Sequence, residues 1–439
     1  MRRSRFMAAA IAAAIAVAPL AAQAPTVSEK KDVAIFALGY YGWAIPQETL
    51  GSIDQEIQKV FVDLGRFNIL GYTERFSSGG LQEFIATLRQ AKEASFVMPE
   101  KFQFGEALFT DAEFNKLLGS FIVAVPVVSE FNSSYNRKTT KWETSIKTNV
   151  TFIDVAAGGS TLGIAEVQTT GTDERNQLES ISNAIDGIPM QLQYEIRKIP
   201  AFQINTRVLT VAGGEIKLQL GQNMGIKKGD EYSIIVGGMV EGFKDEREAG
   251  LVQIKDVGAE VSTGQVVYSS AKVTKDVQLR EIPRMGVDAE PFIHVLMGAS
   301  GATVPGLRMA VSRGFYGFRP YAAVQVPLGQ IWNAFTVFVV PVSVVLGGEY
   351  EAHFGRLTAT PYAGAGVSYL YVSEAITGLS DETNIFPHAG AQAYLNLSYL
   401  FSRDMRAYVD VGAEYWLAIH SFFNNYGGLS IGAGLAFKL

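Results

Sequence analysis

From about residue 290 onward, the chain alternates apolar side chains with polar or small ones. The alternation is clearest at residues 388–401, where Ala, Leu, Tyr or Phe occupies every second position and the positions between hold mostly polar residues and Gly. Successive side chains of a β-strand point to opposite faces, so a period of two predicts strands with one apolar and one polar face. The C-terminal third is therefore expected to be all-β, with every strand separating two different environments.

The alternating segments number eight. They cover residues 290–300, 307–315, 319–328, 338–354, 357–371, 388–401, 405–417 and 429–438. None holds the roughly 18 consecutive apolar residues of a membrane-spanning helix, but a membrane-spanning strand needs only about 9–11 residues. An even number of antiparallel strands can close into a barrel with both chain ends on one side. We therefore predict an eight-stranded antiparallel transmembrane β-barrel.

A water-soluble barrel or β-sandwich with two buried faces is the alternative. Such a fold would need polar side chains on its outer surface, where these segments carry Leu, Val and Tyr. Aromatic residues also gather near the segment ends, as in the interfacial girdles of membrane barrels. They are Tyr369, Tyr371, Tyr399, Phe401 and Tyr415. Both observations favour the transmembrane interpretation.

The polar face of the predicted barrel carries charges. An eight-stranded barrel has an interior just wide enough for its own side chains, so charges that point inward can pair with one another. We expect this of Arg308, Glu349, Glu351, Arg406, Asp410 and Glu414. A polar pathway or ligand site is the alternative to a self-satisfying network. The network is the simpler interpretation, and it predicts a barrel that anchors rather than conducts.

Residues 287–439 resemble the small eight-stranded outer-membrane barrels of the OmpA/OmpX/OmpW type. The resemblance lies in the whole pattern, and one detail departs from it. Such barrels usually end on an aromatic residue, whereas this chain ends Phe437-Lys438-Leu439. The resemblance implies a location in the outer membrane, with the preceding domains in the periplasm.

The N-terminus has the form of an export signal. Arg2, Arg3 and Arg5 precede a short apolar stretch at residues 6–20, and Ala22-Gln23-Ala24 fits a signal-peptidase site. Residues 1–24 are thus predicted to be a signal peptide; a retained membrane anchor would need a longer apolar stretch. The chain has no Cys, which excludes disulfides, thiolate chemistry and a lipoprotein anchor.

Residues 32–200 are predicted to form an α/β domain. Short apolar strands at 33–38 and 67–71 flank a helix at 53–64, and further helices are expected at 81–91 and 114–118. Three antiparallel strands follow at 121–128, 141–155 and 161–170. A long helix then begins near residue 174, and Pro189 should bend or break it.

That order resembles the periplasmic domain shared by the curli-secretion lipoprotein, the lipoprotein activators of penicillin-binding proteins and the flagellar T-ring protein. The matching pieces are the strands at 33–38, 121–125 and 149–155 and the closing helix at 174–198. The lipid-bearing Cys of those lipoproteins is missing here, and the barrel would take over its anchoring role. The resemblance implies a non-enzymatic interaction or assembly protein, with a flagellar or secretion apparatus as its partner.

Residues 201–284 are predicted to form a small all-β domain. The turn Gly225-Ile226-Lys227-Lys228-Gly229-Asp230 joins strands at 215–220 and 232–236, and its glycines allow positive φ. The domain looks like the small barrel-like domain at the end of the flagellar T-ring protein. Lys227 and Lys228 could contact an anionic partner, but a solvated hairpin tip is the simpler interpretation.

Catalytic motifs are missing from the sequence. It contains no P-loop, no Gly-x-Gly-x-x-Gly and no His-Glu-x-x-His, and all four His residues fall in the barrel region. These are His294, His353, His388 and His420. We therefore expect no enzyme, cofactor or metal site, and the formal net charge of −6 argues against nucleic acid.

The expected partners are outer-membrane lipid and an envelope protein; the oligomeric state is left open. Loop aromatics could bind the protein partner or could simply extend the core. They are Tyr40, Tyr41, Trp43, Phe102 and Phe104. Two other functions are alternatives to an anchored interaction protein: a small outer-membrane channel or transporter, and a surface ligand binder or adhesin.

Overall fold

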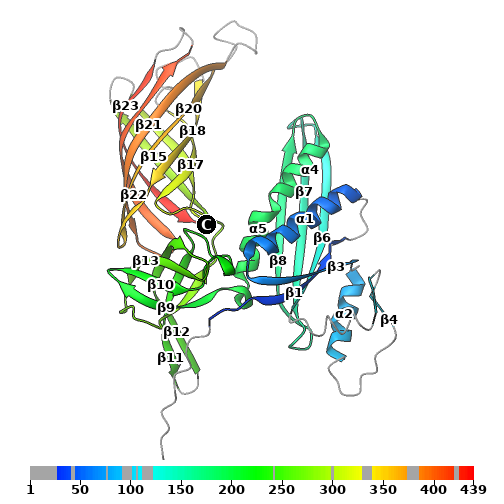
Figure 1. Ribbon diagram of the computed structural model, residues 1–439. Helices are drawn as coiled ribbons and strands as arrows, with labels where there is room; N and C mark the ends of the chain where they lie inside the picture. Colours follow the sequence, from blue (N-terminus) through cyan, green and yellow to red (C-terminus); the bar gives the residue numbers. More distant parts are fainter. Residues whose placement is uncertain are drawn as a thin grey trace, which may run out of the picture.

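The computed structural model contains three units that follow one another along the chain (Figure 1). It describes residues 27–40, 45–75, 78–90, 101–104, 107–110, 122–240, 243–297, 301–328, 339–372, 385–419 and 425–439. The predicted signal peptide and the helix predicted at 114–118 lie outside these residues. The fold class predicted from the sequence is confirmed: an α+β unit, a small all-β unit and an eight-stranded antiparallel barrel.

The α/β domain has a mixed sheet in the order β3-β1-β6-β7-β8, with β2 also paired to β6. Its strands are β1 (Lys31–Ala37), β2 (Gly39–Tyr40), β3 (Phe67–Arg75), β6 (Ile122–Asn136), β7 (Lys141–Asp154) and β8 (Ser160–Asp173). Its helices are α1 (Gln47–Leu64), α2 (Ser78–Gln90), α4 (Gln177–Asp186) and α5 (Ile188–Lys198), followed by the 3-10 turn η1 (Pro200–Phe202). A separate hairpin pairs β4 (Lys101–Phe104) with β5 (Ala107–Thr110).

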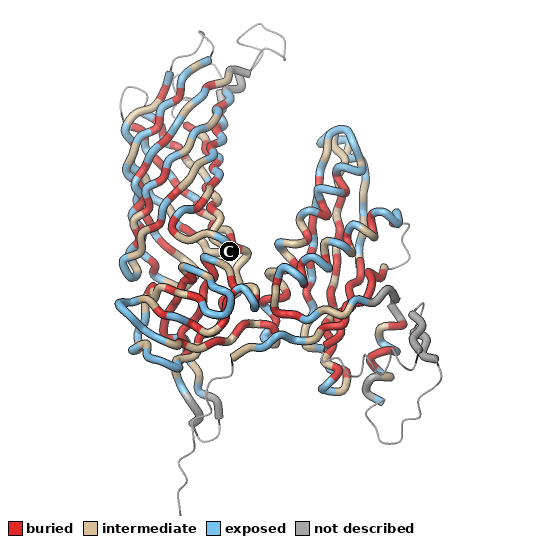
Figure 2. Tube along the Cα trace, viewed as in Figure 1, coloured by how far each residue is buried: buried red, intermediate tan, exposed pale blue. Residues whose placement is uncertain are grey.

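Helices α1, α4 and α5 cover one face of this sheet. The apolar residues of α1 recur at helical spacing, so Ile53, Ile57 and Phe61 are all fully buried in one core with the sheet (Figure 2). On the other face, Phe84 of α2 packs edge-on against Phe36. The long helix predicted from residue 174 is divided at Gly187 into α4 and α5, with Pro189 in the first turn of α5, where a missing N–H costs nothing.

The second unit is a closed six-stranded barrel in the order β10-β13-β12-β11-β14-β9. Its strands are β9 (Asn205–Ala212), β10 (Glu215–Gln219), β11 (Glu231–Val240), β12 (Phe243–Val257), β13 (Val261–Ser269) and β14 (Gln278–Ile282), with the 3-10 turn η2 (Gln222–Met224) after β10.

The turn at residues 225–230 is solvated only in part: Lys228 is exposed, as the sequence suggested, whereas Gly229 and Asp230 are buried. Gly225 and Gly229 both have positive φ, as expected. A Cβ on Gly225 would overlap the carbonyl of Leu64 in the α/β domain, and one on Gly229 would overlap the carbonyl of Ser312 in the third unit. The turn is therefore wedged between both neighbouring units.

The third unit is the closed eight-stranded antiparallel barrel. Its strands are β15 (Val287–Met297), β16 (Ala302–Val311), β17 (Phe318–Gln325), β18 (Val339–Tyr350), β20 (Leu357–Val372), β21 (Ile385–Leu400), β22 (Met405–Ala418) and β23 (Tyr426–Lys438). Pairing of β15 with β23 and of β18 with β20 closes the ring. The short β19 (Ala352–Phe354) continues β18 beyond Glu351 in the same register against β20.

Seven of the eight predicted segments match these strands closely, and the segment at 307–315 is shifted. The strand β16 begins five residues earlier, at Ala302, because Pro305 and Gly306 interrupt the alternation without interrupting the strand. Along β22 the two faces are clear: Val411 is 57% exposed on the outer wall, whereas its neighbour Asp410 is 1% exposed in the lumen.

The upper lumen is filled by aromatic rings that lie against glycines. At each of these glycines an added Cβ would overlap an aromatic side chain. The pairs are Gly306 with Phe292, Gly364 with Tyr321, Gly390 with Trp416, Gly412 with Tyr394, Gly432 with His294 and Gly434 with Tyr408. Because the glycine wall leaves room for the rings, the lumen is packed like a protein core.

Gly306→Ala should destabilise the barrel by about 1–3 kcal/mol, because the new methyl group overpacks against the Phe292 ring. Phe292→Leu should relieve the overlap, so the double variant should lose less stability than the two single variants added together. Thermal unfolding in detergent, followed by circular dichroism, measures all three. Simple additivity would show that the ring and the glycine do not form a unit.

Candidate functional site

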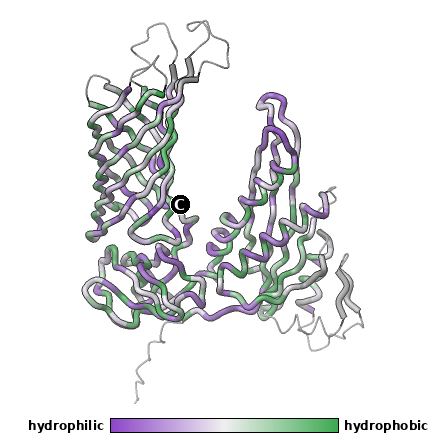
Figure 3. Tube along the Cα trace, turned by 45° about the horizontal axis from the view of Figure 1, so that its top comes forward, coloured by the Kyte–Doolittle hydropathy of each residue, from purple (hydrophilic) through white to green (hydrophobic). Residues whose placement is uncertain are grey.

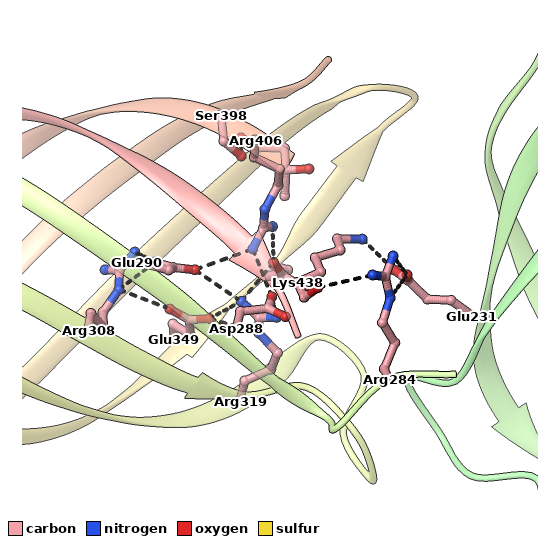
Figure 4. A network of polar contacts seen from close by, with 12 residues as sticks. Glu231, Arg284, Asp288, Glu290, Arg308, Arg319, Glu349, Ser398, Arg406 and Lys438 are labelled. Atoms are coloured by element: carbon pink, nitrogen blue, oxygen red, sulfur yellow. Dashed lines mark hydrogen bonds and ion pairs between the residues drawn. The ribbon is translucent and has the colours of Figure 1, made fainter. Parts of the chain in front are cut away.

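Seven charged side chains fill the lower lumen, at the end of the barrel where Leu439 and the shortest turns lie. We call them the lumen network (Figure 4). They are Asp288 and Glu290 from β15, Arg308 from β16, Arg319 from β17, Glu349 from β18, Glu351 between β18 and β19, and Arg406 from β22. Each is at most 5% exposed. All occupy inward-facing positions near the strand ends. Because successive side chains point to opposite faces of a strand, their sequence neighbours face outward and these seven side chains meet inside the barrel.

Every arginine of the lumen network contacts more than one carboxylate. Arg308 donates to Glu290 through two nitrogens and lies 3.8 Å from Glu349. Arg319 lies 2.7 Å from Asp288 and 2.9 Å from Glu351, and it also donates to Glu349. Arg406 donates to Glu351 and lies 3.1 Å from Asp288. This sharing matters because a buried charge without a partner costs several kcal/mol, about 3–5 when one member of a pair is removed.

The sequence predicted six charged residues in the lumen, and the structure shows that only four of them belong to the lumen network. Arg308, Glu349, Glu351 and Arg406 belong to the lumen network. Asp410 instead lies 3.0 Å from His294, which stacks between Phe292 and Tyr394. Glu414 accepts from Gln325 at 2.6 Å.

Sequence reasoning missed Asp288, Glu290 and Arg319. A signal for the first two was present, since Asp288 and Glu290 stand two residues apart, the same spacing as Glu349 and Glu351. Among the described residues, the space that remains between the lumen side chains from Glu290 across to Arg406 is too small for one water molecule. The lower lumen is therefore a closed ionic plug.

The six-stranded barrel caps this end of the eight-stranded barrel. Leu400 packs against Leu251 and Val267 of the six-stranded barrel, in one apolar cluster with Ile282. Polar contacts surround that cluster: Lys438 with Glu231, Arg403 with Glu248, and the Arg356 guanidinium 3.7 Å from the Tyr268 ring centre. A cavity of about 20 Å³ remains between the two barrels, about the size of one water.

Glu281 of the six-stranded barrel holds the α/β domain. Its carboxylate accepts from Arg66 at 2.7 and 3.1 Å and from Arg197 at 2.6 Å, and it also accepts the backbone N–H of Ile204. All three charged side chains are at most 3% exposed. We call Glu281, Arg66 and Arg197 the interdomain triad.

Asp230 connects this triad to the eight-stranded barrel. Its carboxylate lies 3.4 Å from Arg197 and 2.9 Å from Arg313, which stands in the turn between β16 and β17. Arg313 also donates to Gln193 of α5 at 3.0 Å. All three units therefore meet at a row of alternating charges.

The charges of the triad shift one another's pKa. Burial alone would raise the pKa of Glu281, but the positive charges of Arg66 and Arg197 outweigh it and hold that pKa well below its ordinary value. Burial would likewise lower the pKa of Arg197, but the carboxylates of Glu281 and Asp230 raise it. Both groups are thus ionised at neutral pH, and the arrangement is a structural ion cluster.

Of the aromatic residues predicted to bind a partner, the structure describes only one side chain. Tyr40 is half-buried and packs on the α/β core, whereas Tyr41, Trp43 and the side chains of Phe102 and Phe104 lie outside the described residues. No group of three or more His, Asp and Glu side chains in the described ranges is arranged to hold a metal ion. Among those same residues, no helix is long and apolar enough to cross a membrane.

Comparisons with known proteins give partial likenesses. No protein-family model and no curated protein matches the chain. Among solved structures, Neisserial surface protein A is similar, with 12% identity over 35% of this chain and 96% of that chain and a TM-score of 0.26. The N-terminal β-barrel domain of OprF from Pseudomonas aeruginosa has 13% identity over 35% and 96%, with a TM-score of 0.23. Lipoprotein GNA1162 from Neisseria meningitidis has 10% identity over 37% and 97%, with a TM-score of 0.22.

Glu281→Gln should destabilise the first two units by about 3–5 kcal/mol, because Arg66 and Arg197 would stay buried without their carboxylate. Urea denaturation followed by circular dichroism measures the change. The matched control is Glu195→Gln, which breaks the exposed pair with Lys198 and should cost about 0–1 kcal/mol. Equal effects of the two variants would contradict the role given to Glu281.

The same variant has a pH signature. The pKa of Glu281 is lower in the folded state than in the unfolded chain, where a Glu has a pKa of about 4.3. Ionised Glu281 therefore stabilises the fold above about pH 4.3, and this contribution is lost as the pH falls toward the folded-state pKa. The deficit of Glu281→Gln should accordingly be full at neutral pH and shrink below about pH 4.

Proposed function

We propose that this protein is a non-enzymatic outer-membrane protein whose barrel anchors an interaction domain at the periplasmic face of that membrane. The observation that carries the proposal is the outer wall of the eight-stranded barrel. Every strand that contributes to this wall turns large apolar side chains outward. Examples with at least 40% exposure are Ile293, Leu307, Val324, Val344, Leu397, Val411 and Ile431.

A wall of this kind is suited to lipid. Soluble proteins rarely expose continuous apolar surface on this scale, because water makes such exposure costly. Aromatic side chains stand out at the lower end of the wall, as in an interfacial girdle. These are Phe318, Tyr350, Phe354, Tyr399 and Phe401, each at least 47% exposed.

The barrel ends support a periplasmic orientation of the other units. Both Val287 and Lys438 lie at the lower end, next to the six-stranded barrel. In outer-membrane barrels the short turns face the periplasm, and the turns at this lower end are short. A chain exported through the periplasm would thus leave its soluble units on that side.

The filled lumen supports an anchor over a channel. The ionic plug, the aromatic rings above it and the six-stranded barrel below it together occupy the path that a solute would take. Catalysis has no support either, since the buried carboxylates of the lumen network are taken up by arginines. An anchoring role requires no open path through the barrel.

Val411→Arg tests the membrane wall. A positive charge near the middle of the lipid-facing surface should destabilise the inserted barrel by about 2–4 kcal/mol. The fraction that resists carbonate extraction from liposomes and migrates as a compact, heat-modifiable band measures insertion. We expect that fraction to fall.

The matched control is Val211→Arg, which places the same charge on an exposed valine of the six-stranded barrel. Val411 is 57% exposed and Val211 is 42% exposed. The two sites therefore differ mainly in their proposed surroundings, which are lipid for Val411 and water for Val211. Val211→Arg should insert normally. Normal insertion of Val411→Arg as well would remove the basis for the anchor.

The α/β domain is proposed to bind another envelope protein. Strand β8, of 14 residues, is the last of its sheet, and no strand in the described part of the chain pairs with its outer edge. Such an edge can accept a strand from a partner. The sequence resemblance to the flagellar T-ring protein makes a flagellar or secretion-apparatus component the first partner to look for.

A photo-crosslinking residue at Gln168 tests this surface in living cells. Gln168 is exposed on β8, and Gln58 is equally a glutamine exposed on α1, the helical face. We expect a discrete cross-linked envelope protein from position 168 and none from position 58. Cross-links from neither position would count against a protein partner at this edge.

A further inference from the structure

The eight-stranded barrel is stacked on one end of the six-stranded barrel, and the α/β domain lies beside the six-stranded barrel (Figure 1). In Figure 1 and in the turned view of Figure 3, the hairpin of β6 and β7 rises beside the barrel wall. The apolar band that we assign to lipid runs along this same wall. A bilayer around the barrel would therefore occupy the space in which the hairpin stands.

The surface of that hairpin is unsuited to lipid. Figure 3 shows its tip as hydrophilic. Exposed residues there include Asn132, Ser134, Arg137, Lys138 and Thr139. Neither the charges nor the amide and hydroxyl groups would find partners in hydrocarbon, where unsatisfied polar groups are strongly disfavoured.

We propose that the α/β domain turns away from the barrel when the barrel enters a bilayer, and that the interdomain triad is the latch released by this movement. The inference rests on the proposed membrane location of the barrel. It adds that the arrangement in Figure 1 is the closed state of a hinged molecule, whose open state presents β8 to the periplasm.

The two interfaces of the six-stranded barrel differ in what holds them. An apolar cluster crosses the interface with the eight-stranded barrel, where Leu400 meets Leu251 and Val267. At the interface with the α/β domain, by contrast, the buried apolar residues fall into two separate cores: Phe202 belongs to the α/β core and Ile204 to that of the six-stranded barrel. Val27, in the segment that leads into β1, packs on the core of the six-stranded barrel. Water can replace the partners of an ion pair but cannot replace apolar packing.

The hinge is therefore assigned to the two chain segments that pass between these units, residues 28–31 and 199–205. They lie side by side, since the Ser28 N–H donates to the Asn205 carbonyl at 2.9 Å. Opening there separates Arg66 and Arg197 from Glu281 and exposes all three to water, which solvates them. It also breaks the contact of Gln193 with Arg313, the one side-chain hydrogen bond recorded between the described parts of the α/β domain and the eight-stranded barrel. The stacked pair of barrels stays intact and moves as one body.

Spin-label distances test the hinge, and the chain has no native Cys to interfere. We would label Thr139 at the hairpin tip with Phe401 at the lower end of the barrel. Lys217 with Phe401 reports on the two barrels, and Thr139 with Gln58 reports on the α/β domain alone. All are exposed in the structure. Pulsed electron paramagnetic resonance on the full-length chain in liposomes gives each separation.

The expected result is a Thr139–Phe401 separation longer than the structure gives, with both other separations unchanged. A Thr139–Phe401 separation equal to that of the structure would overturn the proposal. A change in Lys217–Phe401 would overturn it too, because it would place the hinge between the barrels. Carbonate extraction of the same samples keeps the two proposals apart: inserted protein with an unchanged separation defeats the hinge while the anchor stands.

Discussion

The arrangement of this molecule depends on the rule that a buried charge must have a partner. Glu281 sits between Arg66 and Arg197, and Asp230 sits between Arg197 and Arg313, so each carboxylate joins residues from different units. None of the units could bury its own share of these charges alone. The relative placement of three otherwise independent folds is thereby defined by a few contacts whose geometry tolerates little change.

The same rule shapes the barrel interior, together with a limit on volume. Eight strands enclose a lumen that only side chains can fill. The lower half solves this with carboxylates and guanidinium groups that satisfy one another, and the upper half with aromatic rings laid against glycines. Both solutions give a solid interior, which supports the anchoring role proposed for the barrel.

Sequence reasoning reached the barrel because alternation is a local property. Whether a residue holds an odd or an even position along β21 or β22 decides whether its side chain faces the lipid or the lumen. No knowledge of distant residues is needed for this prediction. It failed at the unit interfaces because Arg66 and Glu281 are 215 residues apart and neither lies in a motif. The turn carrying Asp230 looked solvated for the same reason: only the tertiary structure brings Leu64 and Ser312 against it. Asp288 and Glu290 fall between these cases, since their spacing of two was visible but the strand around them alternates less clearly.

The last strand has two tasks at once. Its pairing with β15 completes the circle of the barrel, and the residue at its end, Lys438, reaches Glu231 of the preceding unit. Closure of the barrel and attachment of its cap are thus coupled, because the strand that completes the ring also carries the lysine that pairs with Glu231.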